Sequence, residues 1–184
     1  MHATDEAGNT DPSPASVDFT IDATAPETSI DSGPGASSPG ELTNDRTPTW
    51  TFSSDDVAAD FECQVDSGPW TACDQSYTAS SLNDGAHAFR VRAIDEAANV
   101  DQTPAEATFT VDGTAPQTTI TSGPANGSRT TDDTPTFEFS STEPGAFECR
   151  VDGSGPGGWG SCSSPHTTAS LSDGSHTFEV RATD

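Results

Sequence analysis

Apolar and polar residues alternate with period two in several short stretches, a pattern that predicts half-buried β-strands. Residues 61–65 place Phe, Cys and Val at alternate positions between polar residues, and residues 147–151 repeat that order. Similar alternation occurs over residues 87–91 and 109–111. Asp-Gly, Gly-Pro and Ser/Thr-rich turns separate these stretches, and no window carries a helical stripe. We therefore predict an all-β antiparallel sandwich fold.

The sequence also repeats itself with a period of about 90 residues, the mark of a modular architecture. The recurring segments are Ala-Thr-Asp-Glu-Ala-Gly-Asn at 3–9 and Ala-Ile-Asp-Glu-Ala-Ala-Asn at 93–99, Phe-Thr-Ile-Asp at 19–22 and Phe-Thr-Val-Asp at 109–112, Thr-Ala-Pro at 24–26 and 114–116, Ser-Gly-Pro at 32–34 and 122–124, and Phe-Glu-Cys at 61–63 and 147–149. Each period contains enough strand signals for one sandwich module.

These segments resemble the Ig-like repeats of large bacterial surface proteins and adhesins, of the Bap-like, Asp-x-Ala-Gly-Asn type. The matching stretches are residues 87–124, residues 1–34 without their opening strand, and residues 176–184. The resemblance implies tandem Ig-like antiparallel β-sandwich modules in a cell-surface setting. It implies no common chemistry, because a fold of this kind hosts many functions.

Thr-Ala-Pro marks the junction between modules in this interpretation, which predicts three segments. Residues 1–25 hold the closing strand and linker of a preceding-type or neighbouring-subunit module, residues 26–115 form module 1, and residues 116–184 form module 2 without its last strand. The modules are thus circularly offset, with a spare closing strand at residues 17–22. Predicted strands of module 1 are 28–30, 49–53, 60–66, 70–73, 77–82, 87–93 and 107–112, and module 2 opens near residue 118 and has its sixth strand at 176–181.

The spare strand allows two arrangements. In the first, the chain is a window of a longer tandem array whose ends fall within modules. In the second, Val17, Phe19 and Ile21 of one subunit complete module 2 of the next by strand addition. Such a head-to-tail contact does not close on itself and would build a filament.

The four cysteines predict one disulfide in each module, Cys63 with Cys73 and Cys149 with Cys162. Each pair lies at matching places in the repeat, and the spacing does not suit a structural zinc site. Disulfides indicate a location outside the cytosol. No secretion signal is apparent at residues 1–10, so we expect the signal to lie elsewhere or the chain to be cut from something longer.

The chain is strongly acidic, with 30 Asp and Glu against 6 Arg and no Lys, and a formal net charge of −24. This balance argues against nucleic acid and anionic lipid as partners, because both require basic patches. No apolar span long enough to insert into a membrane is present. The expected partners are neighbouring Ig-like modules or copies of the chain itself, with a glycan or cell-surface ligand as a further alternative.

A cluster of oxygen ligands near the end of module 1 is a candidate Ca²⁺ site, because Ca²⁺ takes six to eight oxygens in flexible geometry. The candidate ligands are Asp95, Glu96, Asn99, Asp101 and Asp112. In the adhesin repeats that this chain resembles, Asp residues of this turn help to bind interdomain Ca²⁺. Ala98 stands where the repeat pattern has Gly. The alternative is that these are ordinary turn residues, since Asp and Asn bond their own backbone.

Signatures of catalysis are absent from the sequence, so we predict that the protein is not an enzyme. His87 and His176 occupy equivalent strand positions and suggest a packing or edge role, and His166 stands where the other repeat has Tyr77. The sequence predicts a non-catalytic structural or adhesive repeat protein that forms a rod-like extracellular stalk. The alternatives are the filament subunit and a glycan-binding accessory sandwich, which would require exposed Trp70 and Trp159 where a spacer would bury them.

Overall fold

A computed structural model of the protein describes residues 3–10, 12–13, 15–153 and 158–184. The chain divides into two compact units, Met1–Asp112 (unit 1) and Gly113–Asp184 (unit 2), which are described separately. All regular elements of the described residues are strands, and several antiparallel sheets confirm the predicted all-β class. Within this described part of the chain, no helix is able to span a membrane.

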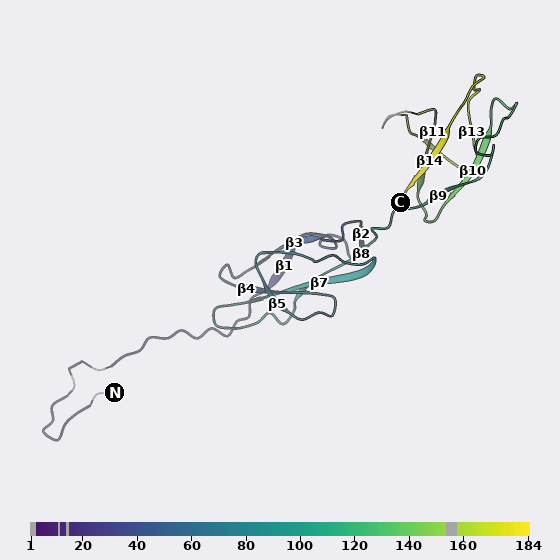
Figure 1. The fold of residues 1–184 in the computed structure, drawn as a ribbon. Helices are drawn as coiled ribbons and strands as arrows, with labels where there is room; N and C mark the ends of the chain where they lie inside the picture. Colours follow the sequence, from purple (N-terminus) through teal and green to yellow (C-terminus); the bar gives the residue numbers. More distant parts are fainter. Residues whose placement is uncertain (1–2, 11, 14, 154–157) are drawn as a thin grey trace. The chain divides into compact units, whose positions relative to one another are not determined.

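Unit 1 consists of two sheets packed face to face (Figure 1). The first sheet has the order β1-β3-β6, with β1 at Thr28–Ser32, β3 at Thr49–Ser54 and β6 at Ser76–Thr78. The second has the order β2-β8-β7-β4-β5, with β2 at Glu41–Thr43, β8 at Ala105–Val111, β7 at Gly85–Ile94, β4 at Asp60–Val65 and β5 at Thr71–Cys73. Every pairing is antiparallel except that of β2 with β8.

The core of unit 1 is built from aromatic rings that meet between the two sheets. Trp50 of β3 and Phe89 of β7 are both fully buried and stack with ring centroids 4.3 Å apart. Phe109 of β8 lies 5.2 Å from the Trp50 ring and closes the core from the side of β8. Burial of such rings supplies a large share of the stability of a small domain that has few large aliphatic side chains.

The packing of the aromatic rings requires glycine in the Ser-Gly-Pro motif. Gly33 has φ of 116°, and a Cβ added there would lie 2.3 Å from Trp50 Cδ1. Trp50 Nε1 donates a hydrogen bond of 3.0 Å to the carbonyl of Pro34. Gly123 of unit 2 repeats the arrangement, with φ of 131° and only 2.6 Å from the added Cβ to Phe137 Cδ1. A larger residue at either glycine would displace the aromatic ring.

Unit 2 repeats six of these strands in two sheets of three. The order of one is β13-β10-β9, with β13 at His166–Thr167, β10 at Thr136–Ser141 and β9 at Thr118–Ser122. The order of the other is β12-β11-β14, with β12 at Gly160–Cys162, β11 at Ala146–Val151 and β14 at Phe178–Thr183. Phe137 of β10 and Phe178 of β14 stack across the sheets at 4.1 Å, as Trp50 and Phe89 do in unit 1.

The strands predicted for module 1 are confirmed as β1 and β3 to β8, with shifts of a few residues at their ends. One strand, β2, was not predicted from the sequence. It has only three residues, and its one large apolar side chain, Leu42, is 67% exposed. Residues 17–22, predicted as a spare closing strand for another module, form no strand within this structure, so that prediction stays untested. A strand requires a hydrogen-bonded neighbour, and no other strand pairs with this segment within the described residues.

Candidate functional site

The two predicted disulfides form, and each one links two strands of a hairpin. Cys63 on β4 bonds to Cys73 on β5, with Cα atoms 5.9 Å apart, and Cys149 on β11 bonds to Cys162 on β12, at 5.8 Å. Cys63 and Cys149 are buried, because they share the inward parity of the neighbouring aromatic residues. None of the described cysteines is free. The described cysteines therefore have a structural role in both units.

The turn at residues 95–99 is organised around the Asp95 carboxylate. Asp95 Oδ1 accepts a hydrogen bond of 2.8 Å from the Asn99 backbone N–H, and Oδ2 accepts one of 2.7 Å from Asn99 Nδ2. Hydrogen bonds from the Asn99 side chain, with those from backbone groups of the turn, lower the pKa of Asp95. Both carboxylate oxygens thus already have donors within the turn.

Ala98 adopts the left-handed conformation that Gly supplies in the repeat pattern. Its φ is 66°, compared with 86° for Gly8 in the related turn at residues 5–9. Asp5 and Asn9 repeat the bonds of Asp95 and Asn99, since Asn9 Nδ2 donates to Asp5 Oδ2 at 2.8 Å. The change from Gly to Ala therefore preserves the loop but places a Cβ where the backbone disfavours one.

Asp101 lies inside unit 1, only 2% exposed, and joins three segments of backbone. Its Oδ2 accepts a hydrogen bond of 2.6 Å from Thr28 Oγ1, whose oxygen accepts one of 2.9 Å from the Ala93 N–H. Thr103 donates through N and Oγ1 to Asp101 Oδ1, at 2.7 and 3.0 Å. Burial opposes ionisation of Asp101, but these hydrogen bonds outweigh it and lower the pKa. This carboxylate holds the start of β1 against the end of β7.

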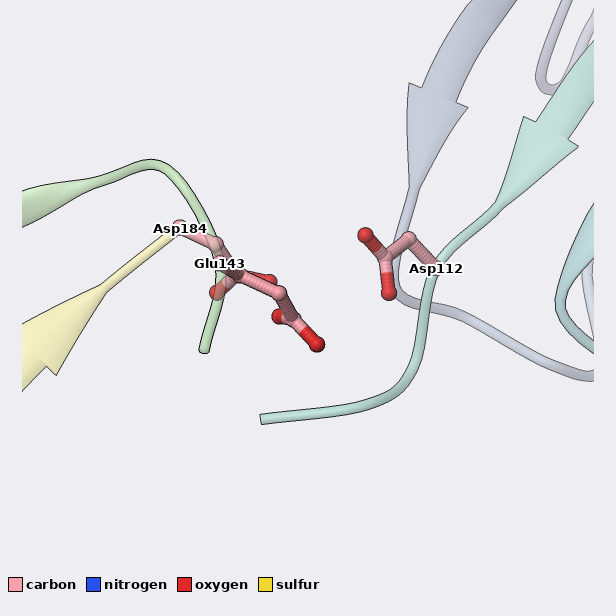
Figure 2. A group of neighbouring side chains, drawn as sticks. All are labelled: Asp112, Glu143 and Asp184. Atoms are coloured by element: carbon pink, nitrogen blue, oxygen red, sulfur yellow. The ribbon is translucent and has the colours of Figure 1, made fainter. Parts of the chain in front are cut away.

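The other predicted Ca²⁺ ligands, Glu96 and Asp112, differ from Asp101 in burial and contacts. Glu96 is exposed, and the half-buried Asp112 donates its backbone N–H to the Thr43 carbonyl at 2.9 Å. Figure 2 labels Asp112 at the end of unit 1 and, in unit 2, Glu143 and Asp184. Glu143 and Asp184 have carboxylate oxygens within 4.8 Å of each other. Two carboxylates are fewer than the ligands that Ca²⁺ takes, so Ca²⁺ binding stays a prediction for titration to test.

A histidine–aspartate pair recurs in both units and was not predicted from the sequence. His87 contacts Asp66 Oδ2 through Nδ1 at 2.9 Å and the Asn83 carbonyl through Nε2 at 2.9 Å. Because both partners are acceptors, only the imidazolium donates to both. Burial opposes that charge, but the Asn83 carbonyl and the Asp66 carboxylate outweigh it and raise the pKa of His87.

The same histidine–aspartate pair, the His–Asp clasp, forms in unit 2 with His176 in place of His87. Its Nδ1 contacts Asp152 Oδ2 at 2.5 Å and its Nε2 contacts the Ser172 carbonyl at 2.7 Å. The Asp152 hydrogen bond and the Ser172 carbonyl raise the pKa of His176. Asp66 and Asp152 share a φ of 53°. The available signal was the repeated Val-Asp and Asp-Gly-x-His-x-Phe pattern.

The two hairpin tryptophans are half-buried on the outer faces of the sheets, between the two states considered from the sequence. The Arg92 guanidinium lies 4.4 Å from the Trp70 ring centroid and pairs with Glu62 at 2.7 Å. Around Trp159, two guanidinium groups lie 4.3 and 4.4 Å from the ring, those of Arg150 and Arg181. These pair in turn with Glu179 and Glu148, at 2.7 and 2.6 Å. Both rings therefore carry arginine side chains from their own sheet.

His166 is a packing residue, in line with its alignment on Tyr77. Its ring stacks on Phe178 at 5.8 Å, and the Tyr77 ring stacks on Phe89 at 5.6 Å. The apolar residues of the N-terminal segment remain in solvent, with Val17 81%, Phe19 78% and Ile21 81% exposed. They do not belong to the core of unit 1.

Both units are thus antiparallel β-sandwiches with one disulfide each and with repeated polar residues that fix turns. Residues 24–113, which include all the strands of unit 1, match the family model described as bacterial Ig-like domain. This segment is an Ig-like domain, as the sequence resemblance implied, whereas the match does not extend to the Bap-like repeat type. No curated protein gives a significant match to the chain.

Proposed function

We propose that the protein is a non-catalytic structural or adhesive module of a bacterial cell surface, built into a rod-like stalk. The observation that carries this proposal is the match of residues 24–113 to a bacterial Ig-like domain whose fully buried core contains Trp50, Phe89 and Phe109. Ig-like domains are generally not enzymes, and their disulfides suit an oxidising exterior. The mechanism is mechanical, because a closed and crosslinked sandwich keeps its two ends apart under load.

The contacts of the repeated polar residues support a structural role rather than a catalytic or ligand-binding one. Asp95 and Asp101 hold turns and strand ends, and His87 clasps a loop through Asp66. The Trp70 ring lies against Arg92, so an incoming sugar would have to displace a guanidinium from that ring. This arrangement supports a spacer over a glycan-binding platform.

Force spectroscopy of the full chain tests the mechanical role. Each disulfide removes the residues between its cysteines from the extensible length, a sequence separation of 10 in unit 1 and 13 in unit 2. At up to ~3.6 Å per residue, reduction should lengthen the unfolded contour by about 30 Å in unit 1 and about 40 Å in unit 2. Unfolding steps of the oxidised chain at negligible force, or lengths that reduction does not change, would contradict a load-bearing, crosslinked module.

Thiol labelling in intact cells that produce the protein tests its location. Outside the cytosol all four cysteines should resist alkylation until a reductant is added, because both pairs are bonded. Protease added to the same cells should remove the protein. Free thiols together with protection from protease would place the protein in the cytosol and refute the proposed surface role.

A further inference from the structure

The disulfide of unit 1 joins a cysteine of the core to one that is partly open to solvent. Cys63 is 1% exposed and belongs to the apolar core that also contains Phe52 and Phe61. Its partner Cys73 is half-buried and lies on β5, which pairs with β4 alone among the described strands. A thiolate that opens a disulfide must reach one of its two sulfur atoms. In unit 1 the accessible one belongs to Cys73.

An open hollow of about 430 Å³ gives access to Cys73. Its lining includes Asp60, at the start of β4, and Asp74, which follows β5. Both side chains are exposed, and neither carboxylate forms a hydrogen bond or an ion pair with another described residue. No basic residue is among the described residues that line the hollow. The approach to Cys73 is therefore negatively charged.

The equivalent position in unit 2 lacks both charges. In each unit the cysteine of the short strand is opposite a Phe, which aligns β5 with β12. Ala146 and Ser163 then stand where unit 1 has Asp60 and Asp74. Cys162 of β12 is half-buried, like its counterpart in β5. The chain thus contains two disulfides of the same topology that differ in the charge beside the more accessible cysteine.

We propose that Cys73 is a thiol-exchange site and that Asp60 and Asp74 make it selective for uncharged or cationic small thiols over anionic ones. The attacking thiolate bonds to Cys73 Sγ while the bond to Cys63 Sγ breaks, and Cys63 keeps the electron pair and takes a proton from water. A second thiolate attacks the small-molecule sulfur of this mixed disulfide, and Cys73 leaves and is protonated in turn. The small thiol is oxidised to its disulfide, and the protein disulfide is reduced.

Two physical effects set the rate of this exchange. The leaving thiolate of Cys63 forms in an apolar core, where a charge is poorly solvated, so the folded chain should exchange at least about 100-fold more slowly than the unfolded chain. The two carboxylates add a barrier for anionic thiols. A unit charge roughly 6 Å away in water changes such a rate about threefold, so a pair changes it about tenfold. This inference goes beyond the proposed mechanical role and does not depend on it.

The test is the rate of disulfide opening in the full chain with cysteamine, mercaptoethanol and mercaptoethanesulfonate, which carry a cationic, an uncharged and an anionic group. Each rate is taken per thiolate and divided by the rate of the same thiol on a small uncharged disulfide, which removes differences in reactivity. Mass spectrometry after an alkylating quench reports each unit. We expect mixed disulfides at Cys73 rather than Cys63. The ratio of the cysteamine rate to the sulfonate rate should be about tenfold higher in unit 1 than in unit 2, and high salt should reduce that difference.

Neutral replacement of the two carboxylates tests their role directly. Asp60→Asn combined with Asp74→Asn should lower the ratio in unit 1 to that of unit 2. The matched control is Asp31→Asn combined with Asp45→Asn, which removes the same charge from exposed residues outside the hollow and should leave the ratio unchanged. Mixed disulfides at Cys63, equal ratios in the two units of the wild-type chain, or a ratio that the first pair of substitutions does not change would overturn the proposal.

Discussion

Units 1 and 2 share six strands, a hairpin disulfide and a His–Asp clasp, yet their cores differ in how far they are closed. Phe89 of unit 1 is fully buried, whereas its equivalent Phe178 of unit 2 is half-buried. The same holds for Trp50 and its equivalent Phe137. The difference follows from β8, which covers one side of the core in unit 1. In a small sandwich a single strand therefore decides whether the shared core residues are shielded from water.

The largest effect should come from removing the central aromatic ring of each unit. Trp50→Ala should destabilise unit 1 by about 3–5 kcal/mol, the usual cost of truncating a fully buried ring. Phe137→Ala should cost unit 2 only about 1–2 kcal/mol, because the ring is half-buried. Hydrogen exchange with mass spectrometry reports each unit separately.

Trp50→Phe is the conservative control, since it installs in unit 1 the aromatic residue that unit 2 has. Equal costs for Trp50→Ala and Phe137→Ala would mean that the two cores are equally closed in solution, and the comparison between the units would fail.

A smaller effect should appear as pH dependence with the same sign in both units. The folded-state pKa of His87 and of His176 is raised above 6.5, so the clasp stabilises fully below pH 6.5 and is lost as pH rises through the folded pKa. Asp66 and Asp152 have pKa values lowered from 3.8, so their contribution is lost as pH falls through those values. The clasp should therefore be strongest between about pH 4 and 6.5.

Thermal unfolding followed from about pH 4 to pH 9 should show the clasp's contribution to stability being lost above pH 6.5. His87→Gln should flatten the dependence in unit 1 and leave that of unit 2 in place, and His176→Gln should do the reverse. We expect the weaker response in unit 2, because the His176 side chain is 25% exposed and that of His87 is 13%. Stability that rises between pH 6.5 and 9 in the wild-type chain, and falls there in both variants, would contradict the assignment.

The elements that sequence could predict are those set by local periodicity. Phe61, Cys63 and Val65 share one parity, which placed β4, and the matching places of one cysteine pair in each repeat predicted the bond of Cys63 with Cys73. The short β2 has no such pattern, because its pairing with β8 rests on backbone bonds between distant segments. For the same reason the alternation at residues 17–22 did not make a strand: periodicity describes a face, and only a neighbour supplies the ladder.

The polar residues were harder to assign, because composition does not tell where a side chain points. Asp95 and Asp101 are near in sequence, yet one carboxylate caps its own turn and the other lies buried on Thr28. Trp70 was expected to be exposed in a glycan-binding sandwich or buried in a spacer, and it is half-buried against the Arg92 guanidinium. Such contacts depend on registers between strands that a single sequence leaves open.

The smallest effect concerns the turn at residues 95–99 and should widen the gap between the units. Ala98 has φ of 66°, a region in which a Cβ costs roughly 1–2 kcal/mol. Ala98→Gly removes that strain but adds about 0.5–1 kcal/mol of chain entropy to the unfolded state. The net gain should be about 0.5 kcal/mol and confined to unit 1, because Ala98 and its turn lie in that unit.

Ala97→Gly is the matched control for this change, because Ala97 is exposed and its φ is not positive. It adds the same flexibility to the unfolded chain without relieving strain, so it should destabilise unit 1 slightly. Chemical denaturation read by hydrogen exchange in β7 separates the two variants. If both glycines shift stability in the same direction, the left-handed turn stores no strain, and Ala98 fits this position as well as the Gly that the repeat pattern places there.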